Sequence, residues 1–139
     1  MKLIPLVDRF GTVRAWADRK SGLVSNPAGN ALALIEFDAV FRFSGSQIGW
    51  WFGDHIRDRY GQVVLARPSA KIDGLAMPRP QESPEPAKIY LPSGRPVLQW
   101  LLPAPMKQHA WGNLESLFSG GLERVRAFEA NLRKFQQKG

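Results

Sequence analysis

The sequence contains no cysteine and only two histidines, His55 and His109, among its 139 residues. Without cysteine, the chain has no disulfide framework, no thiolate metal site and no cysteine nucleophile. Two histidines leave few groups that could bind zinc or act as a base at neutral pH. We therefore expect neither a metal nor a cofactor.

Long apolar runs are also missing. No apolar stretch approaches the roughly 20 residues that a membrane-spanning helix needs. Residues 1–10 contain no long apolar run followed by a small-residue cleavage site, as a secretory signal would. We expect a cytoplasmic protein with no membrane partner.

Positive charge exceeds negative charge, but it is not concentrated. The net charge is +7. Residues 1–67 carry 9 Lys and Arg against 6 Asp and Glu, residues 68–111 carry 5 against 3, and residues 112–139 carry 5 against 3. This even distribution argues against a dedicated basic arm, and it leaves nucleic acid as an alternative partner.

A turn signature that ends in glycine occurs four times, at residues 8–11, 26–29, 42–45 and 58–61. Asp or Asn at the first position can accept a hydrogen bond from the backbone two residues later, and Gly at the fourth tolerates the left-handed conformation that closes a hairpin. The sequence therefore predicts four tandem β-hairpins within residues 1–67. The third turn begins with Arg42 and is the weakest of the four predictions. The predicted turn residues are Asp8, Gly11, Asn26, Gly29, Gly45, Asp58 and Gly61.

The residues around each glycine repeat as well. Five residues before it stand Leu6, Val24, Val40 and Ile56. Three and five residues after it stand Arg14 and Trp16, Leu32 and Leu34, Ile48 and Trp50, and Val64 and Ala66. Because strand side chains alternate, we expect this last set to share one buried face. Four residues after it stand Ala15, Ala33, Gly49 and Leu65, and the small members allow close approach of neighbouring backbones. A lone hairpin is marginal in water, so we expect the four to close into a ring.

Two segments of the later hairpins carry a family resemblance. Residues 45–52 read GSQIGWWF, and residues 56–64 read IRDRYGQVV. With the earlier turns, they resemble the bacterial 4-fold β-flower proteins over residues 4–67, and residues 111–118 are similar in character to tails of that family. The resemblance implies a mainly β fold with four hairpin repeats around a pseudo-four-fold axis. It implies no activity.

The second half of the chain divides into three further parts. Residues 68–87 hold five prolines and predict an extended linker or strap. Residues 88–111 predict an additional hairpin around Ser93-Gly94, followed by an aromatic docking segment with His109 and Trp111.

Residues 112–139 predict a short helical turn that starts at Asn113 and then a C-terminal amphipathic α-helix. The apolar stripe of this helix consists of Leu122, Val125, Phe128, Leu132 and Phe135. It must pack on the chain's own sheet or on a second subunit, and a homo-oligomer is the favoured reading.

His55 is the best candidate for chemistry, because Asp54 and Asp58 lie close to it in sequence. No nucleophile motif accompanies it, so a turn histidine is the simpler interpretation. The turn residues Asp8, Asn26 and Asp58 carry side-chain oxygens and could suggest calcium, but each turn offers one such side chain and calcium takes six or more oxygens. Turn capping accounts for them.

The run Trp50-Trp51-Phe52 must place Trp51 on the opposite strand face from its two neighbours. Trp51, His55, Arg57 and Arg59 form a hypothetical binding set, because aromatic residues and arginine are enriched at binding hot spots. Packing of these residues under the strap is the competing interpretation. The leading hypothesis is a non-enzymatic binding or adaptor module for a protein or ligand. A nucleic-acid or nucleotide-binding protein is the alternative, and an enzyme that uses His55 comes third.

Overall fold

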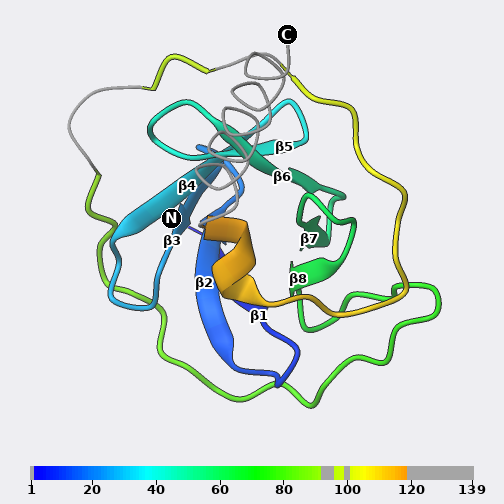
Figure 1. The fold of residues 1–139 in the computed structure, drawn as a ribbon. Helices are drawn as coiled ribbons and strands as arrows, with labels where there is room; N and C mark the ends of the chain where they lie inside the picture. Colours follow the sequence, from blue (N-terminus) through cyan, green and yellow to red (C-terminus); the bar gives the residue numbers. More distant parts are fainter. Residues whose placement is uncertain (1, 92–95, 99–100, 119–139) are drawn as a thin grey trace, which may run out of the picture.

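The computed structural model describes residues 2–91, 96–98 and 101–118, and it contains eight β-strands. Figure 1 shows their arrangement. The strands are β1 (Leu3–Val7), β2 (Val13–Asp18), β3 (Leu23–Ser25), β4 (Ala31–Glu36), β5 (Ala39–Phe41), β6 (Gln47–Trp51), β7 (His55–Arg57) and β8 (Val63–Ala66).

Each strand pairs antiparallel with the next, and β8 pairs with β1 through Ala66 and Val7, so the sheet is a closed barrel. The predicted mainly β fold with four hairpin repeats is confirmed. A short helical turn over residues 114–118 follows. The predicted helix with the stripe from Leu122 to Phe135 lies outside the described residues. The described residues contain no helix that is long and apolar enough to cross a membrane.

The four predicted turns close the hairpins β1–β2, β3–β4, β5–β6 and β7–β8. In each turn the glycine N–H donates to the carbonyl oxygen three residues earlier, at 2.9–3.0 Å, and each glycine has a positive φ. The carboxylate of Asp58 accepts hydrogen bonds from the N–H groups of Tyr60 and Gln62, at 2.9 and 3.0 Å. Arg42 cannot cap its turn in this way, yet the third turn has the same backbone geometry. These four turns define one end of the barrel, which we call the hairpin end.

The prediction that the residues three and five after each turn glycine share one strand face is wrong. The residue three after each turn glycine is the extra residue of a β-bulge: Leu6 pairs with Ala15 and Val7 with Val13, which leaves Arg14 unpaired. The other hairpins repeat this shift. A bulge breaks the simple alternation of side chains. Ile48 and Val64 therefore face the interior, whereas Trp16 and Ala66 lie in outer clusters.

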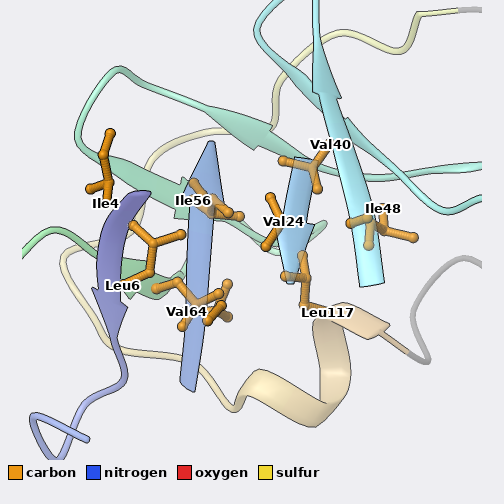
Figure 2. Close-up of a cluster of buried hydrophobic side chains, with 12 residues drawn as sticks. Ile4, Leu6, Val24, Val40, Ile48, Ile56, Val64 and Leu117 are labelled. Atoms are coloured by element: carbon orange, nitrogen blue, oxygen red, sulfur yellow. The ribbon is translucent and has the colours of Figure 1, made fainter. Parts of the chain in front are cut away.

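The interior is closed at the hairpin end by the helical turn. Leu117 is 1% exposed and belongs to the same cluster as Leu6, Val24, Val40 and Ile56. Figure 2 shows its side chain directed from the turn into this cluster. Gly49 makes room for it, because a Cβ at Gly49 would lie 2.9 Å from Leu117 Cδ1 and 2.6 Å from the carbonyl oxygen of Arg57. As predicted from its size, Gly49 allows a close backbone approach.

Asn113 starts the helical turn, as predicted. Its side-chain oxygen accepts a hydrogen bond from the N–H of Glu115 at 3.2 Å, and its carbonyl oxygen accepts one from the N–H of Ser116 at 3.1 Å. The Ser116 hydroxyl also lies 3.2 Å from Oδ2 of Asp58, which joins the turn to the fourth hairpin.

We call residues 68–111 the belt, and its described parts run around the outside of the barrel (Figure 1). The belt meets the four turn glycines in order. The carbonyl oxygens of Arg79, Lys88, Val97 and Met106 fill the space that a Cβ at Gly11, Gly29, Gly45 and Gly61 would need. Two residues later the belt N–H groups of Gln81, Tyr90 and Gln108 donate to the carbonyl oxygens of Gly11, Gly29 and Gly61, at 2.8, 2.6 and 3.0 Å.

These belt contacts are spaced nine residues apart, and the sequence follows the same period. Pro-x-x-Gln occurs at residues 78–81, 96–99 and 105–108, and residues 87–90 replace it by Ala-Lys-Ile-Tyr. The turn of the hairpin predicted in residues 88–111 lies outside the described residues. Lys88 and Val97, which would lie in its two arms, contact different hairpins of the barrel, at Gly29 and Gly45.

Candidate functional site

The end of the barrel opposite the helical turn is open. The connections at this end are residues 18–22, 37–38 and 52–54, and we call it the mouth. A hollow of about 650 Å³ lies here. Its apolar floor consists of Ile4, Ala17, Leu34, Ile35 and Trp51, and its charged rim consists of Asp18, Arg19, Lys20, Glu36 and Asp38.

The rim is held by local hydrogen bonds. The Ser21 hydroxyl donates to Asp18 at 2.7 Å, and this bond is the main cause that lowers the pKa of Asp18 below its ordinary value of 3.8. Asp18 is therefore a carboxylate at neutral pH. Three carboxylates outnumber the two cationic side chains around the hollow.

The two-residue turn Phe37-Asp38 projects beside this hollow. Both residues have positive φ, 54° and 58°, which is the backbone of a type I′ turn. Such turns favour Asn and Gly, and a bulky residue in this region is strained. The Phe37 side chain is nevertheless 73% exposed. Burial of the Phe37 ring within the described structure therefore does not offset the backbone strain at this position.

Trp51 connects the turn to the floor. Its backbone N–H donates to the carbonyl oxygen of Asp38 at 2.9 Å, and its side chain packs on the interior cluster. A second hollow, of about 550 Å³, continues from Phe37 and Trp51 toward Phe52 and Leu102. An exposed ring on a strained turn thus stands between two hollows.

His55 and Arg57 lie elsewhere, buried in the wall between β7 and the belt. The His55 Nδ1 lies 2.5 Å from Oδ1 of Asp54, and the Nε of Arg57 donates to His55 Nε2 at 3.1 Å. Since Nε2 accepts, the Nδ1 carries the proton that is donated to Asp54. Burial is the main cause that lowers the pKa of His55 below its ordinary value of 6.5, against the opposing effect of Asp54.

Arg57 ties the belt to the fourth hairpin. Its guanidinium donates to the carbonyl oxygens of Gly61 at 2.6 Å and Gln108 at 2.8 Å. The ring of Phe52 stacks on His55 at 5.1 Å, and Lys107 Nζ lies 4.6 Å from the centre of that ring. The surroundings of His55 and Arg57 are therefore structural, because both ring nitrogens of His55 contact other side chains of the protein.

The hypothetical binding set is not brought together. Trp51 lines the mouth, His55 and Arg57 lie under the belt, and Arg59 is in the fourth turn at the hairpin end, where its guanidinium lies 4.8 Å from the Tyr60 ring. Trp50 packs under the belt, with its Nε1 donating to the carbonyl oxygen of Leu102 at 3.0 Å. Trp51 is thus the member of the set that belongs to the mouth.

The match to known families follows the architecture just described. Residues 4–117 match the model of the 4-fold beta flower protein family. The chain belongs to this family. The match extends beyond the hairpins through the belt to Leu117, so the belt and most of the helical turn lie within the matched region. No curated protein and no solved structure matches the chain.

The sequence offered little signal for the remaining mouth residues. Phe37 and Asp38 lack the Asn-Gly signature of a two-residue hairpin turn. The belt contacts could have been predicted from the sequence, because the pattern around Pro-x-x-Gln has a spacing of nine residues. The prolines of this pattern were interpreted as a linker instead.

Proposed function

We propose that this β-flower protein is a non-enzymatic binding module, and that its mouth receives a partner protein. The observation that carries the proposal is the difference between the two ends of the barrel. Leu117 fills one end, and the exposed turn with Phe37 lines a hollow at the other. Packing alone gives no reason for an exposed Phe37 at a strained position.

The composition of the mouth favours protein over nucleic acid. Protein interfaces combine an apolar, aromatic-rich centre with a polar rim, and the floor and rim of the mouth have this arrangement. Phosphate binding depends on accumulated positive charge, whereas carboxylates predominate around this hollow. The partner is another protein or a second copy of this chain, and the same surface serves both cases.

The geometry of His55 supports a non-enzymatic reading. A general base needs a ring nitrogen that can reach a substrate proton. Both ring nitrogens of His55 are engaged, one by Asp54 and one by Arg57, and Asp58 caps its own turn instead of contacting the ring.

Photo-cross-linking tests the proposal directly. A benzophenone side chain introduced at Phe37 should form a covalent adduct with one reproducible partner in cells of the source organism. The matched control is the same label at Tyr60, which is 55% exposed but lies at the hairpin end. Adducts that are equal at both positions, or absent at Phe37, would contradict the proposal.

A Phe37→Asn variant separates function from folding. Asn is favoured in type I′ turns, so this variant should be as stable as the parent or more stable in thermal melting. It should nevertheless lose the partner, measured by co-purification with the adduct identified above. A variant that keeps the partner would show that the exposed ring is not part of the contact.

A further inference from the structure

Exposed aromatic rings in this protein are covered by the chain's own basic side chains. Three rings that are more than half exposed have a cation over one face: Arg9 lies 4.7 Å from the centre of the Phe10 ring, Arg59 4.8 Å from that of Tyr60, and Lys88 5.4 Å from that of Tyr90. In each pair the cation stands one or two residues before the ring. The negative face of an aromatic ring attracts a cation at such distances, so each of these rings has a partner of complementary charge.

Phe37 is an exception to this pattern. Its side chain is 73% exposed, and no basic side chain of the described residues lies over its ring. Glu36 and Asp38 stand on either side of it, whereas Phe10 and Tyr60 each follow an arginine. Both acidic residues are exposed, and neither forms an ion pair within the part of the chain that the structure describes. The turn therefore presents an uncovered ring between two unpaired negative charges.

The second hollow, of about 550 Å³, adjoins this ring. The charged residue of its lining is Asp38, and its walls include the aromatic side chains of Phe37, Trp51 and Phe52. The space beside Gly53, which also lines the hollow, is open, because nothing lies within 4 Å of the position that a Cβ would take there. A hollow with aromatic walls and a carboxylate has the chemistry of a site for an organic cation.

The chain's own cations near the mouth are placed elsewhere. Lys107 Nζ lies 4.6 Å from the centre of the Phe52 ring, but Lys107 is not part of the lining of this hollow. Arg19 and Lys20 line the first hollow and not the second. The described residues therefore leave the exposed ring and its carboxylate without a cation.

We propose that this second hollow receives an arginine side chain of the partner protein that binds at the mouth. The inference rests on the proposed function, because that partner supplies the cation. The guanidinium lies on the face of the Phe37 ring and pairs with the carboxylate of Asp38, and the aliphatic part of the side chain contacts Trp51. Arginine fits better than lysine, because its planar guanidinium stacks on aromatic rings and binds a carboxylate through two parallel hydrogen bonds. Arginine is also enriched in protein interfaces.

Two blocked tripeptides test the requirement for charge. Ac-Leu-Arg-Leu-NH₂ and its citrulline counterpart Ac-Leu-Cit-Leu-NH₂ have side chains of nearly the same shape, but citrulline is neutral. Each is titrated into the full chain, and nitrogen–proton correlation spectra follow the indole N–H of Trp51 and the backbone N–H groups of residues 37 and 38. The arginine peptide should shift these signals with a dissociation constant of roughly millimolar. The citrulline peptide should bind about fivefold more weakly, because it loses the attraction to the ring and to the carboxylate.

Matched variants assign the effect to this hollow. Asp38→Asn keeps a residue that tolerates the positive φ of the turn, so it should weaken binding of the arginine peptide several-fold and leave the citrulline peptide unchanged. Phe37→Leu keeps an apolar side chain without the ring, and it should also reduce the preference for arginine. Glu85→Gln is the control, because it removes the same charge from an exposed belt residue outside the lining of the hollow. Thermal melting checks that all three variants fold.

Three results would overturn the inference: equal affinity for the arginine and citrulline peptides, no shift at Trp51 and residues 37–38 with either peptide, or an arginine preference that persists in both Asp38→Asn and Phe37→Leu. Photo-cross-linking at Phe37 tests the proposed function separately. A reproducible adduct together with equal peptide affinities would keep the mouth as a binding surface and remove the arginine. Selective binding of the arginine peptide without an adduct would support the cation site and contradict the partner.

Discussion

At the scale of single residues, two constraints favour glycine in the turns: the backbone conformation and the space available for a Cβ. Gly61 has φ +78°, and the carbonyl oxygen of Met106 occupies the place of its missing Cβ. The first constraint follows from the sequence pattern, because an Asp three residues earlier marks the turn. The second does not, because it depends on where the belt passes.

Gly61→Val should therefore destabilise the protein by roughly 1 kcal/mol or more, since it strains the backbone and displaces the belt. Chemical denaturation measures the free energy of unfolding. Gly53 is the control: it also has positive φ, +87°, but nothing lies within 4 Å of the Cβ position. Gly53→Val should cost less than Gly61→Val. Equal losses would mean that the belt contact contributes nothing.

His55 makes stability depend on pH. Its pKa is lowered by burial in the folded state, so the unfolded chain binds the proton first as the pH falls below 6.5. The neutral ring's contribution is fully present above that pH and is lost as the pH falls from 6.5 toward the folded-state pKa. The melting temperature should drop between pH 7.5 and pH 5.5.

The pH effect should shrink in His55→Asn and persist in His109→Asn, where the Nδ1 of His109 lies 2.8 Å from the backbone oxygen of Asp73 in the exposed belt. Differential scanning fluorimetry across this range makes the comparison. A pH profile that is unchanged in His55→Asn would assign the effect to other groups.

At the scale of elements, the helical turn stabilises the barrel through one side chain. Leu117→Ala should lower the free energy of unfolding by about 2–5 kcal/mol, as for other large-to-small changes in a core. Met106→Ala is a suitable control, because Met106 is 82% exposed. A loss at Leu117 no greater than at Met106 would show that the turn does not close the interior.

The strands were predictable from the sequence, whereas their faces were not. Turn chemistry is local, so Asp8 and Gly11 locate a hairpin without knowledge of the rest of the chain. The bulge at Arg14 arises from pairing between two strands, and it shifts every later side chain by one face. That is why Trp16 packs outside with Leu3 and Val13 and not in the interior.

At the scale of the whole molecule, the barrel, the belt and the helical turn form one arrangement with two different ends. The sequence could predict a ring of hairpins, because lone hairpins are unstable. It could not predict which end stays open, because that depends on Leu117 entering the barrel from a segment 56 residues beyond Gly61. For the same reason Trp51 could be singled out, but its neighbours Phe37 and Asp18 could not.

Self-association remains a prediction for the intact chain. If the stripe from Leu122 to Phe135 pairs between subunits, light scattering should give a dimer or higher oligomer for the full chain and a monomer for a version that ends at Gly120. The described barrel is retained in both. A monomer in both cases would contradict the prediction.

The central claim is that the mouth is the binding surface, and hydrogen–deuterium exchange of the partner complex tests it most directly. On binding, exchange should slow in residues 18–22, 37–38 and 52–54, which form the mouth. Exchange should stay unchanged in the four turns at the hairpin end. Protection that is confined to the hairpin end, with the mouth unaffected, would contradict the account.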